Sequence, residues 1–582
     1  MKYCSIILLF CTILTSISLH SQQQEPQEYK RLMLELIPAD AVFTASIKCN
    51  AIDAKTNLKN LSELSVSEDL ITRAAKLLEI NESRFMLEMI RNPKSKGIEF
   101  PTELMAFGEA ESNIKYFNIL IPVSDAAVFK TEISSYFGPK FNNSIVVKGQ
   151  QLAYIHNERI AISWNKQIAV LTFLLADQYL DFSTEESRSE LRISLESYLD
   201  NLYSTDVSES MAQNSQFKSW YDKLRDAGIW IDYKEVMRLN LENSMGSSEM
   251  TRMARNIAEI ILSSYGEMSL ASDLSFEKGK IISDTKMFAP DDIISFSKMA
   301  TSNRANKKML KYMDGQKTGI YMTMASSPKG VYEGWKKFLA EKAGGYKKSV
   351  EDLFGFLEIF IDEKEAFNFL KGDLFYAING LKTIEKTNTA YMYDSEKDEY
   401  LPVETKNKEQ IPLFAAGFSY GKREHILKLI RIVERTGFLK NSKKNLYKLS
   451  LPTFDEPIFL KLDKGLLVIS NDEQRMLEDK QYRPMPKIHN QFIKKDFQTL
   501  QINTEALVDI IVGTNPPDEI KQMLKNIKDG VGDISLHSLR PKNSDIYISQ
   551  NFELDLKNKD ENALKQFFDF LERIYIKTMK GL

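Results

Sequence analysis

Cysteine and histidine are scarce in this chain of 582 residues, which contains three Cys and five His. Cys49 is the only cysteine after residue 21, so the rest of the chain cannot form an internal disulfide. We interpret Cys49 as a buried apolar residue at a strand end, rather than as a nucleophile or the site of an intermolecular bridge. The histidines are far apart, and no His-x-x-x-His or paired-cysteine spacing occurs. The sequence therefore predicts no metal site.

The chain also lacks a strong excess of charge and the common nucleotide-binding motifs. Its net charge is −3 at pH 7, which favours no association with nucleic acid. There is no Gly-x-x-x-x-Gly-Lys-[Ser/Thr] sequence, and segment 530–532 lacks the third glycine and the preceding buried strand of a dinucleotide site. The acidic segment 394–399 lacks the glycine and the closing glutamate of a calcium-binding loop. We therefore predict no cofactor, and a solvated acidic tip at 394–399.

Beyond the first residues, no apolar run reaches the roughly 20 residues that span a membrane. The chain begins with one positive charge, Lys2, an apolar run from Ile6 to Leu14, and then small and polar residues. This pattern is typical of a secretory signal peptide, which we place at residues 1–21. Lipid attachment at Cys11 is the alternative, although Phe10 stands where a small residue is expected. We predict an exported protein, periplasmic or associated with the outer membrane, without a transmembrane segment in the mature chain.

The same succession of predicted strands, helices and hairpins occurs twice. A chain of this length exceeds the roughly 250–300 residues at which a single core stops growing, so several domains are expected. Phe217 and Phe492 begin matching segments 275 residues apart, and Ile231 and Ile502 lie in matching strands 271 residues apart. This near-constant offset predicts an internal duplication.

We divide the chain into four parts in the order A–B–A′–B′. The strands alternate between apolar and polar residues, which favours antiparallel sheets with helices on one face, an α+β class. A polar connector occupies 176–211, and segment 381–411 is an addition within A′ that we expect to form an exposed loop or hairpin tip. The predicted parts are A at 37–175, B at 212–300, A′ at 318–478 and B′ at 488–577.

Periodicity and turn residues predict the individual elements. Hairpins are expected where two alternating runs flank Asn157 or the turn Asp463-Lys464-Gly465. The expected strands include 42–47, 115–121, 280–288, 320–325 and 413–420, and the expected helices include 125–137, 250–264, 422–435, 518–527 and 561–575.

The opening Ile37-Pro38-Ala39-Asp40-Ala41, followed by a strand and a polar helix start, resembles that of an uncharacterised family of exported bacterial proteins. The Ser163-Trp164-Asn165 ending of the first hairpin is also similar, as are the length and the signal peptide. The resemblance implies an exported protein associated with the periplasm or the cell surface, and it transfers no catalytic residue. From the residues alone, we expect Pro38 to fix the entry into the first strand and Asp40 to bond a backbone amide.

One enzymatic motif occurs, Gly417-Phe418-Ser419-Tyr420-Gly421, which matches Gly-x-Ser-x-Gly between a predicted strand and a predicted helix. In such a motif Ser419 is a nucleophile and a histidine is the base, with His425 the first candidate and His489 and His537 the others. The matching strand of part A lacks the motif, and the chain does not alternate between parallel strands and helices. We therefore interpret Ser419 as part of a glycine-flanked strand end.

Residues 422–448 hold nine Lys and Arg against two Glu. On a helix, Lys428, Arg431 and Arg435 would share one face, which could bind an anionic glycan, lipid headgroups or an acidic partner. The alternative is an ordinary solvated helix face. Trp164 follows the first hairpin, so we expect it to be exposed and give it a weak role in binding.

Taken together, these features predict a non-catalytic exported protein that acts at the cell envelope by binding or scaffolding. The unidentified partner would be an envelope protein, a glycan or a lipid, and duplicated sheets offer paired edges for it. Two alternatives stay open at this stage. One is a serine hydrolase that uses Ser419, and the other is a carrier that holds a lipid or another apolar ligand between sheet and helices.

Overall fold

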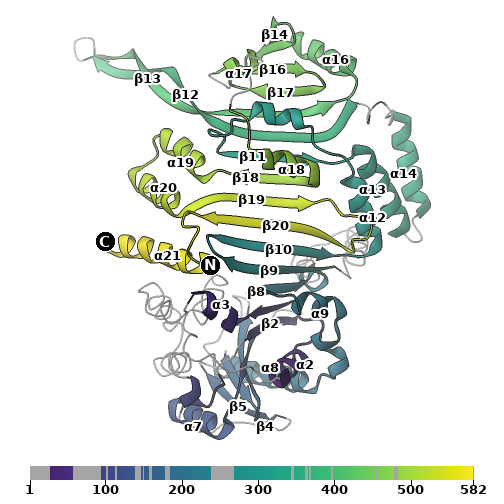
Figure 1. Cartoon of the computed structure of the whole chain (residues 1–582), viewed down its shortest axis with the longest axis vertical. Helices are drawn as coiled ribbons and strands as arrows, with labels where there is room; N and C mark the ends of the chain where they lie inside the picture. The colour runs from purple at the N-terminus through teal and green to yellow at the C-terminus, as the bar shows by residue number, and fades with distance from the viewer. Residues whose placement is uncertain are drawn as a thin grey trace. The chain divides into compact units, whose positions relative to one another are not determined.

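The structure is a computed structural model of the chain (Figure 1), and it forms two compact units. Unit 1 comprises residues 1–289 and 558–582, and unit 2 comprises residues 290–557. The predicted signal peptide at 1–21 and the predicted helix at 250–264 lie outside the described residues. The structure describes residues 27–56, 93–99, 103–111, 114–137, 146–147, 150–155, 160–176, 184–237, 268–342, 347–360, 365, 367, 369–394, 398–451, 456–477 and 483–580.

The described strands of unit 1 form an antiparallel sheet in the order β4-β5-β6-β7-β3-β2-β1-β8-β9-β10. Its first strand, β1, lies between β2 and β8, so residues far apart in the chain are paired. The strands are β1 (Phe43–Ile47), β2 (Leu104–Glu111), β3 (Ile114–Pro122), β4 (Val146–Val147), β5 (Gln150–Ile155), β6 (Ile160–Trp164), β7 (Ile168–Ala176), β8 (Ala227–Asp232), β9 (Ser269–Glu277) and β10 (Lys280–Phe288).

The central strands of unit 1 are covered on both faces, which corrects the expectation of helices on one face. Phe117 and Ile119 of β3 belong to the same core as Phe129 of α7 (Ala126–Phe137). On the opposite face of β3, the ring of Tyr116 stacks on Tyr198 of α8 (Glu185–Ser204). The near-continuous apolar sequence of β7 is typical of a strand buried on both faces. The other described α-helices of unit 1 are α2 (Gln27–Leu36), α3 (Cys49–Thr56), α9 (Ser215–Tyr221) and α21 (Ala563–Lys580).

Unit 2 contains an antiparallel sheet in the order β14-β15-β16-β17-β13-β12-β11-β18-β19-β20. When the strands of each unit are numbered along the chain, this order is the same as that of unit 1, strand by strand. The strands are β11 (Ile320–Ala325), β12 (Leu370–Asp394), β13 (Glu399–Tyr420), β14 (Leu439–Lys443), β15 (Leu446–Leu449), β16 (Ile458–Asp463), β17 (Leu466–Ser470), β18 (Asp496–Ile502), β19 (Val531–Leu539) and β20 (Tyr547–Leu556).

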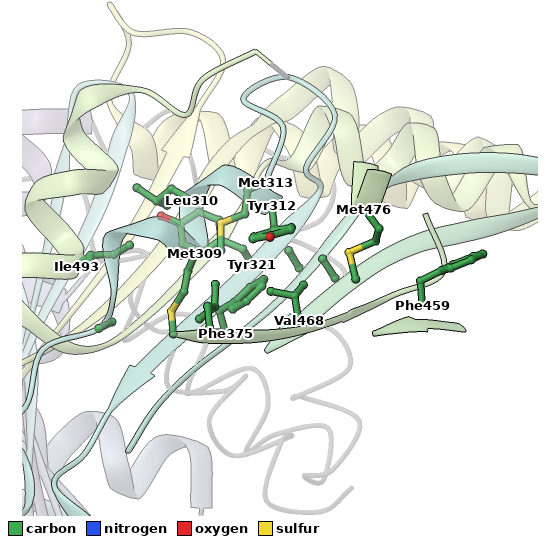
Figure 2. Close-up of a cluster of buried hydrophobic side chains, with 14 of the residues drawn as sticks. Met309, Leu310, Tyr312, Met313, Tyr321, Phe375, Phe459, Val468, Met476 and Ile493 are labelled. Atoms are coloured by element: carbon green, nitrogen blue, oxygen red, sulfur yellow. The ribbon is translucent and has the colours of Figure 1, made fainter. Parts of the chain in front are cut away.

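The main core of unit 2 lies under a short 3-10 helix, η5 (Lys307–Tyr312). Figure 2 shows Met309 and Tyr312 of η5 gathered with Tyr321 of β11, Phe375 of β12 and Val468 of β17. Side chains from three strands therefore hold the sheet and η5 together. The described α-helices of unit 2 are α12 (Asp291–Ala300), α13 (Pro328–Lys342), α14 (Lys347–Phe360), α16 (Arg423–Glu434), α17 (Glu473–Leu477), α18 (Lys487–Lys495), α19 (Thr504–Gly513) and α20 (Asp518–Gly530).

The helices that follow the tenth strands are not where the predicted parts placed them. Helix α12 follows β10 and was assigned to part B, yet it belongs to unit 2. Helix α21 follows β20 and was assigned to part B′, yet it belongs to unit 1. Leu564 and Phe568 of α21 pack against Ile47 and Ile52 of unit 1. The burial of these apolar side chains, rather than their position in the chain, decides to which unit α21 belongs.

Segment 381–411, predicted as an exposed addition, forms a long two-stranded arm. From the pair Leu381–Pro412 to the pair Asp394–Glu399, β12 and β13 pair with each other without a register shift. Figure 1 shows this ribbon projecting from the rest of unit 2.

Among the helices that the structure describes, none combines the length and the apolar character required to cross a membrane.

Candidate binding surface and the predicted site residues

Helix α16 begins three residues after β13 ends and packs on the sheet through one stripe of side chains. Ile426 and Ile430 are buried in a core that also contains Tyr420 and Leu467. Leu429 and Val433 have the same helical spacing as this stripe, but they are not buried with it. Leu429 and Val433 are exposed to 49% and 40%. The helix covers only a narrow part of the sheet, so positions 429 and 433 turn away from it.

The three predicted cations lie on the outward side of this helix. Lys428, Arg431 and Arg435 are all exposed. Lys440 and Lys443 on β14, the strand at the edge of the described sheet of unit 2, are also exposed. Among the residues that the structure describes, none of these five cations has a carboxylate within ion-pair distance. Their charge is therefore available to a partner.

Exposed apolar side chains lie among the cations, which sequence reasoning did not predict. Ile432 is exposed to 58%, and Phe438, just after the helix, is exposed to 42%. Apolar groups of this size are costly to leave in water, and when clustered they mark interaction sites. We define the α16 surface as Lys428, Leu429, Arg431, Ile432, Val433, Arg435 and Phe438. It offers positive charge and apolar contact together, the chemistry that suits an anionic partner with apolar groups.

Ser419 and His425 are not brought together as a catalytic pair. The Ser419 hydroxyl donates to Oδ2 of Asp373 (2.9 Å) and accepts from the side-chain amide of Asn306 (3.2 Å). His425 instead lies against Glu365 and Phe369, with Nε2 3.3 Å from the Glu365 carboxylate. Both residues are described, and no hydrogen bond joins them. Ser419 is also only 6% exposed, within the paired part of β13.

Close strand packing explains the first glycine of this motif. Gly417 lies inside β13, opposite Val468 of β17. A Cβ atom there would lie 2.3 Å from the carbonyl oxygen of Leu467, so any larger residue would push the strands apart. The motif is therefore a place where β17 approaches β13 closely, and Ser419 is paired in the ladder rather than presented on a sharp strand-to-helix turn.

We expect a fluorophosphonate probe to leave Ser419 unlabelled, because its hydroxyl is buried and donates to Asp373. Replacing Ser419 by Ala should instead destabilise unit 2 by about 1–3 kcal/mol, because a buried carboxylate loses a donor. Labelling followed by mass spectrometry, and urea unfolding, test the two expectations. Labelling that disappears in the Ser419→Ala variant would contradict this account and favour a serine hydrolase.

The other candidate histidines, His489 on α18 and His537 on β19, are buried and each has its own partner. Nδ1 of His537 lies 2.8 Å from the Asp496 carboxylate. The Tyr321 hydroxyl is hydrogen-bonded to Nδ1 of His489. Burial, together with the nearby His537, lowers the pKa of His489 from 6.5 to about 4. His489 is therefore neutral near pH 7.

This lowered pKa predicts acid sensitivity of unit 2. Above pH 6.5, His489 is neutral in both the folded and the unfolded chain. Below pH 6.5, His489 of the unfolded chain binds a proton, whereas His489 of the folded chain stays neutral until about pH 4. The free energy of unfolding therefore falls between these pH values, by up to about 3 kcal/mol. Urea unfolding across this range should show the loss, and His489→Gln should flatten it. An unchanged slope in His489→Gln would contradict the assignment.

Trp164 and Cys49 are both part of the core of unit 1. The expectation that Trp164 is exposed is wrong, since it is 2% exposed and its ring meets Phe129 edge to face at 5.6 Å between centroids. Trp164 therefore offers no surface for binding. Cys49 is buried in the same cluster, at the start of α3 directly after β1, as its interpretation as an apolar residue predicted.

Segment 38–40 lines an acidic depression of about 520 Å³ in unit 1. Asp40, Glu109 and Glu209 supply its carboxylates, and Tyr198 lies at its wall. Burial and the neighbouring Glu109 hold the pKa of Tyr198 well above its usual value. Backbone pairing of Pro38 with Ser210 and of Ala39 with Glu209 joins this segment to residues 209–210. Nowhere in the described parts of the chain do His, Cys, Asp or Glu cluster closely enough to hold a metal ion.

Comparisons of the chain with family models, with curated proteins and with solved structures each find no match.

Proposed function

We propose that this chain is a non-catalytic exported protein that acts at the cell envelope by binding or scaffolding, and that the α16 surface is where its partner binds. The observation that carries the proposal is a combination on α16: exposed apolar side chains, and exposed cations that have no carboxylate within ion-pair distance among the described residues. A solvated helix face would carry the cations without Ile432 and Phe438, which are exposed to 58% and 42%. The signal-like first residues and the resemblance at 37–41 support the export part of the proposal.

Among the described residues, no histidine contacts Ser419, and this supports the non-catalytic part of the proposal. The Ser419 hydroxyl donates to a carboxylate that already accepts two backbone amides, those of Asn306 and Ser419 itself. A carboxylate satisfied in this way is a structural acceptor rather than a general base directed at a substrate.

We infer further that the two units are copies of one ancestral unit. The matching strand orders, the offsets of 275 and 271 residues, and the similar placement of α12 and α21 after the tenth strands all support this. Duplication of a sheet without reactive groups suits a scaffold, because each copy adds strand edges and helix faces for binding and adds no catalytic residues. The arm at 381–411 and the α16 surface both lie in the second copy.

Photocrosslinking in the producing cells tests the binding surface. A photoreactive p-benzoylphenylalanine placed at Ile432 should form an adduct with the partner, and Lys428→Glu/Arg431→Glu/Arg435→Glu should abolish the adduct. Ile546 is the matched control site, because it lies in the same unit and is equally exposed, at 58%. A surface without a partner would give no adduct at position 432, or equal adducts at 432 and 546, and would contradict the proposal.

A further inference from the structure

The arm ends in a cluster of exposed aromatic and aliphatic side chains. Tyr391 and Tyr400 are each exposed to 68%, and Met392 and Tyr393 also lie in solvent. Directly opposed residues of an antiparallel pair share a face. The pairs Tyr391–Pro402 and Tyr393–Tyr400 therefore make an aromatic face, and Met392–Leu401 makes an aliphatic one. We call Tyr391, Met392, Tyr393, Tyr400, Leu401 and Pro402 the arm tip.

The part of the arm between the tip and the sheet is mostly polar. Its paired residues include Thr387–Lys406, Glu385–Lys408 and Thr389–Glu404. From Leu381 outward, the described residues of the arm pair only with each other, because β11 ends its pairing with β12 at Ile378 and β17 ends its pairing with β13 at Ala415. A two-stranded ribbon that pairs with no third strand is marginally stable in water. Apolar groups concentrated at the end of a polar ribbon indicate that the end binds something.

The charges around the tip are opposite to those of the α16 surface. The turn sequence 394–399 contains four acidic residues and one lysine. Asp398 and Glu399 are exposed there, beside the aromatic face. The α16 surface carries three exposed cations around Leu429, Ile432 and Phe438. The two surfaces therefore match in charge and in apolar character.

A single copy does not bring the two surfaces together. Figure 1 shows the arm projecting away from the end of unit 2 that carries α16. At about 3.3 Å per residue, the ribbon from Leu381 to Asp394 extends roughly 45 Å, long enough to reach across to another molecule.

We propose that the arm tip of one copy binds the α16 surface of a second copy, so that the chain assembles with itself. This inference rests on the proposed function in that it names the occupant of the same surface. Lys428, Arg431 and Arg435 pair with Asp398 and Glu399, and the tyrosines cover Leu429, Ile432 and Phe438. If two copies exchange arms, the assembly closes as a dimer, and if they do not, it extends head to tail.

Sedimentation velocity of the full chain at low and high salt tests the assembly. We expect self-association that weakens as salt rises, because the contact pairs opposite charges. The tip variant, Tyr391→Ser/Tyr393→Ser/Tyr400→Ser, and the surface variant, Lys428→Glu/Arg431→Glu/Arg435→Glu, should each weaken it by roughly tenfold or more. A variant of the polar part of the arm, Thr383→Ser/Thr387→Ser/Thr389→Ser, is the matched control and should associate normally.

Mixing the two variants distinguishes this contact from any other. The tip variant keeps an intact α16 surface and the surface variant keeps an intact tip, so a mixture should recover association that neither shows alone. A full chain that stays monomeric, association that survives both variants, or a mixture that does not recover would each overturn the inference. An Ile432 adduct with a different molecule from a monomeric chain would overturn it too, while leaving the proposed function in place.

Discussion

Replacing Arg475 by Leu is expected to lower the free energy of unfolding of unit 2 by about 3–5 kcal/mol. Arg475 lies on α17 and is only 5% exposed. Its Nη1 donates to the carbonyl oxygen of Tyr312 (2.7 Å), and its Nη2 lies 3.6 Å from the buried carboxylate of Asp314. Without the guanidinium, the Asp314 charge stays buried with no cation to compensate it. The loss of that compensation, rather than the loss of one hydrogen bond, sets the size of the effect.

Hydrogen exchange followed by mass spectrometry measures this effect unit by unit. Peptides from the sheet of unit 2 should exchange faster in Arg475→Leu, while peptides from unit 1 serve as the internal control. The exchange rate in Arg475→Lys should lie between those of Arg475→Leu and the original chain. A lysine keeps the positive charge but lacks the planar guanidinium group and its several donors. Removing both charges with Arg475→Leu/Asp314→Leu should recover part of the loss. Equal exchange in Arg475→Leu and the original chain would contradict the prediction.

Replacing Trp230 by Ala is expected to cost unit 1 about 3–5 kcal/mol, the range for truncating a large buried aromatic side chain. Trp230 on β8 is buried, and its ring lies 5.6 Å from Phe217, 6.0 Å from Trp220 and 5.4 Å from Phe288, between centroids. Three elements, α9, β8 and β10, therefore meet at this one side chain. The cavity left by alanine would remove contacts from all of them at once.

Thermal unfolding and hydrogen exchange of peptides around β8 measure the loss. Trp230→Phe is the matched control, because it keeps an aromatic ring and leaves a smaller cavity, so its cost should be clearly lower. Peptides of unit 2 should be unchanged in both variants. If Trp230→Phe and Trp230→Ala cost the same, ring packing is not what holds this part of unit 1.

The elements with strong local patterns were predictable from sequence. The strand predicted at 280–288 is β10, the strand at 320–325 is β11, and the hairpin around the turn 463–465 is β16 and β17. At that turn, Lys464 and Gly465 adopt positive φ angles of 46° and 89°, as the Asp-x-Gly pattern predicts. Alternation and turn chemistry involve neighbouring residues, so they can be read without knowing the fold.

The candidate site was predictable only in part. The position of its charged residues follows from the sequence of one helix, whereas the exposure of its apolar residues depends on the rest of the fold. Lys428, Arg431 and Arg435 share an exposed face, as their helical spacing predicts. Leu429 and Val433 fit the same spacing as Ile426 and Ile430, yet only the latter two are buried. A period of 3.6 residues identifies a stripe, but the width of the surface beneath the helix decides how much of the stripe is covered. Trp164 shows the reverse case. Its side chain was expected to be exposed, but Phe129 and the sheet bury it.

By itself, the sequence determined the α+β class, many strand positions, the helices α7, α16, α20 and α21, the extra segment at 381–411 and the basic face of α16. Only the tertiary structure decided the order of the strands, the units to which α12 and α21 belong, the partners of Ser419, and the exposure of Leu429 and Ile432. The physical reason is that helices, strands and turns follow from neighbouring residues, whereas burial follows from contacts between residues hundreds of positions apart, such as Asn562 and Phe276.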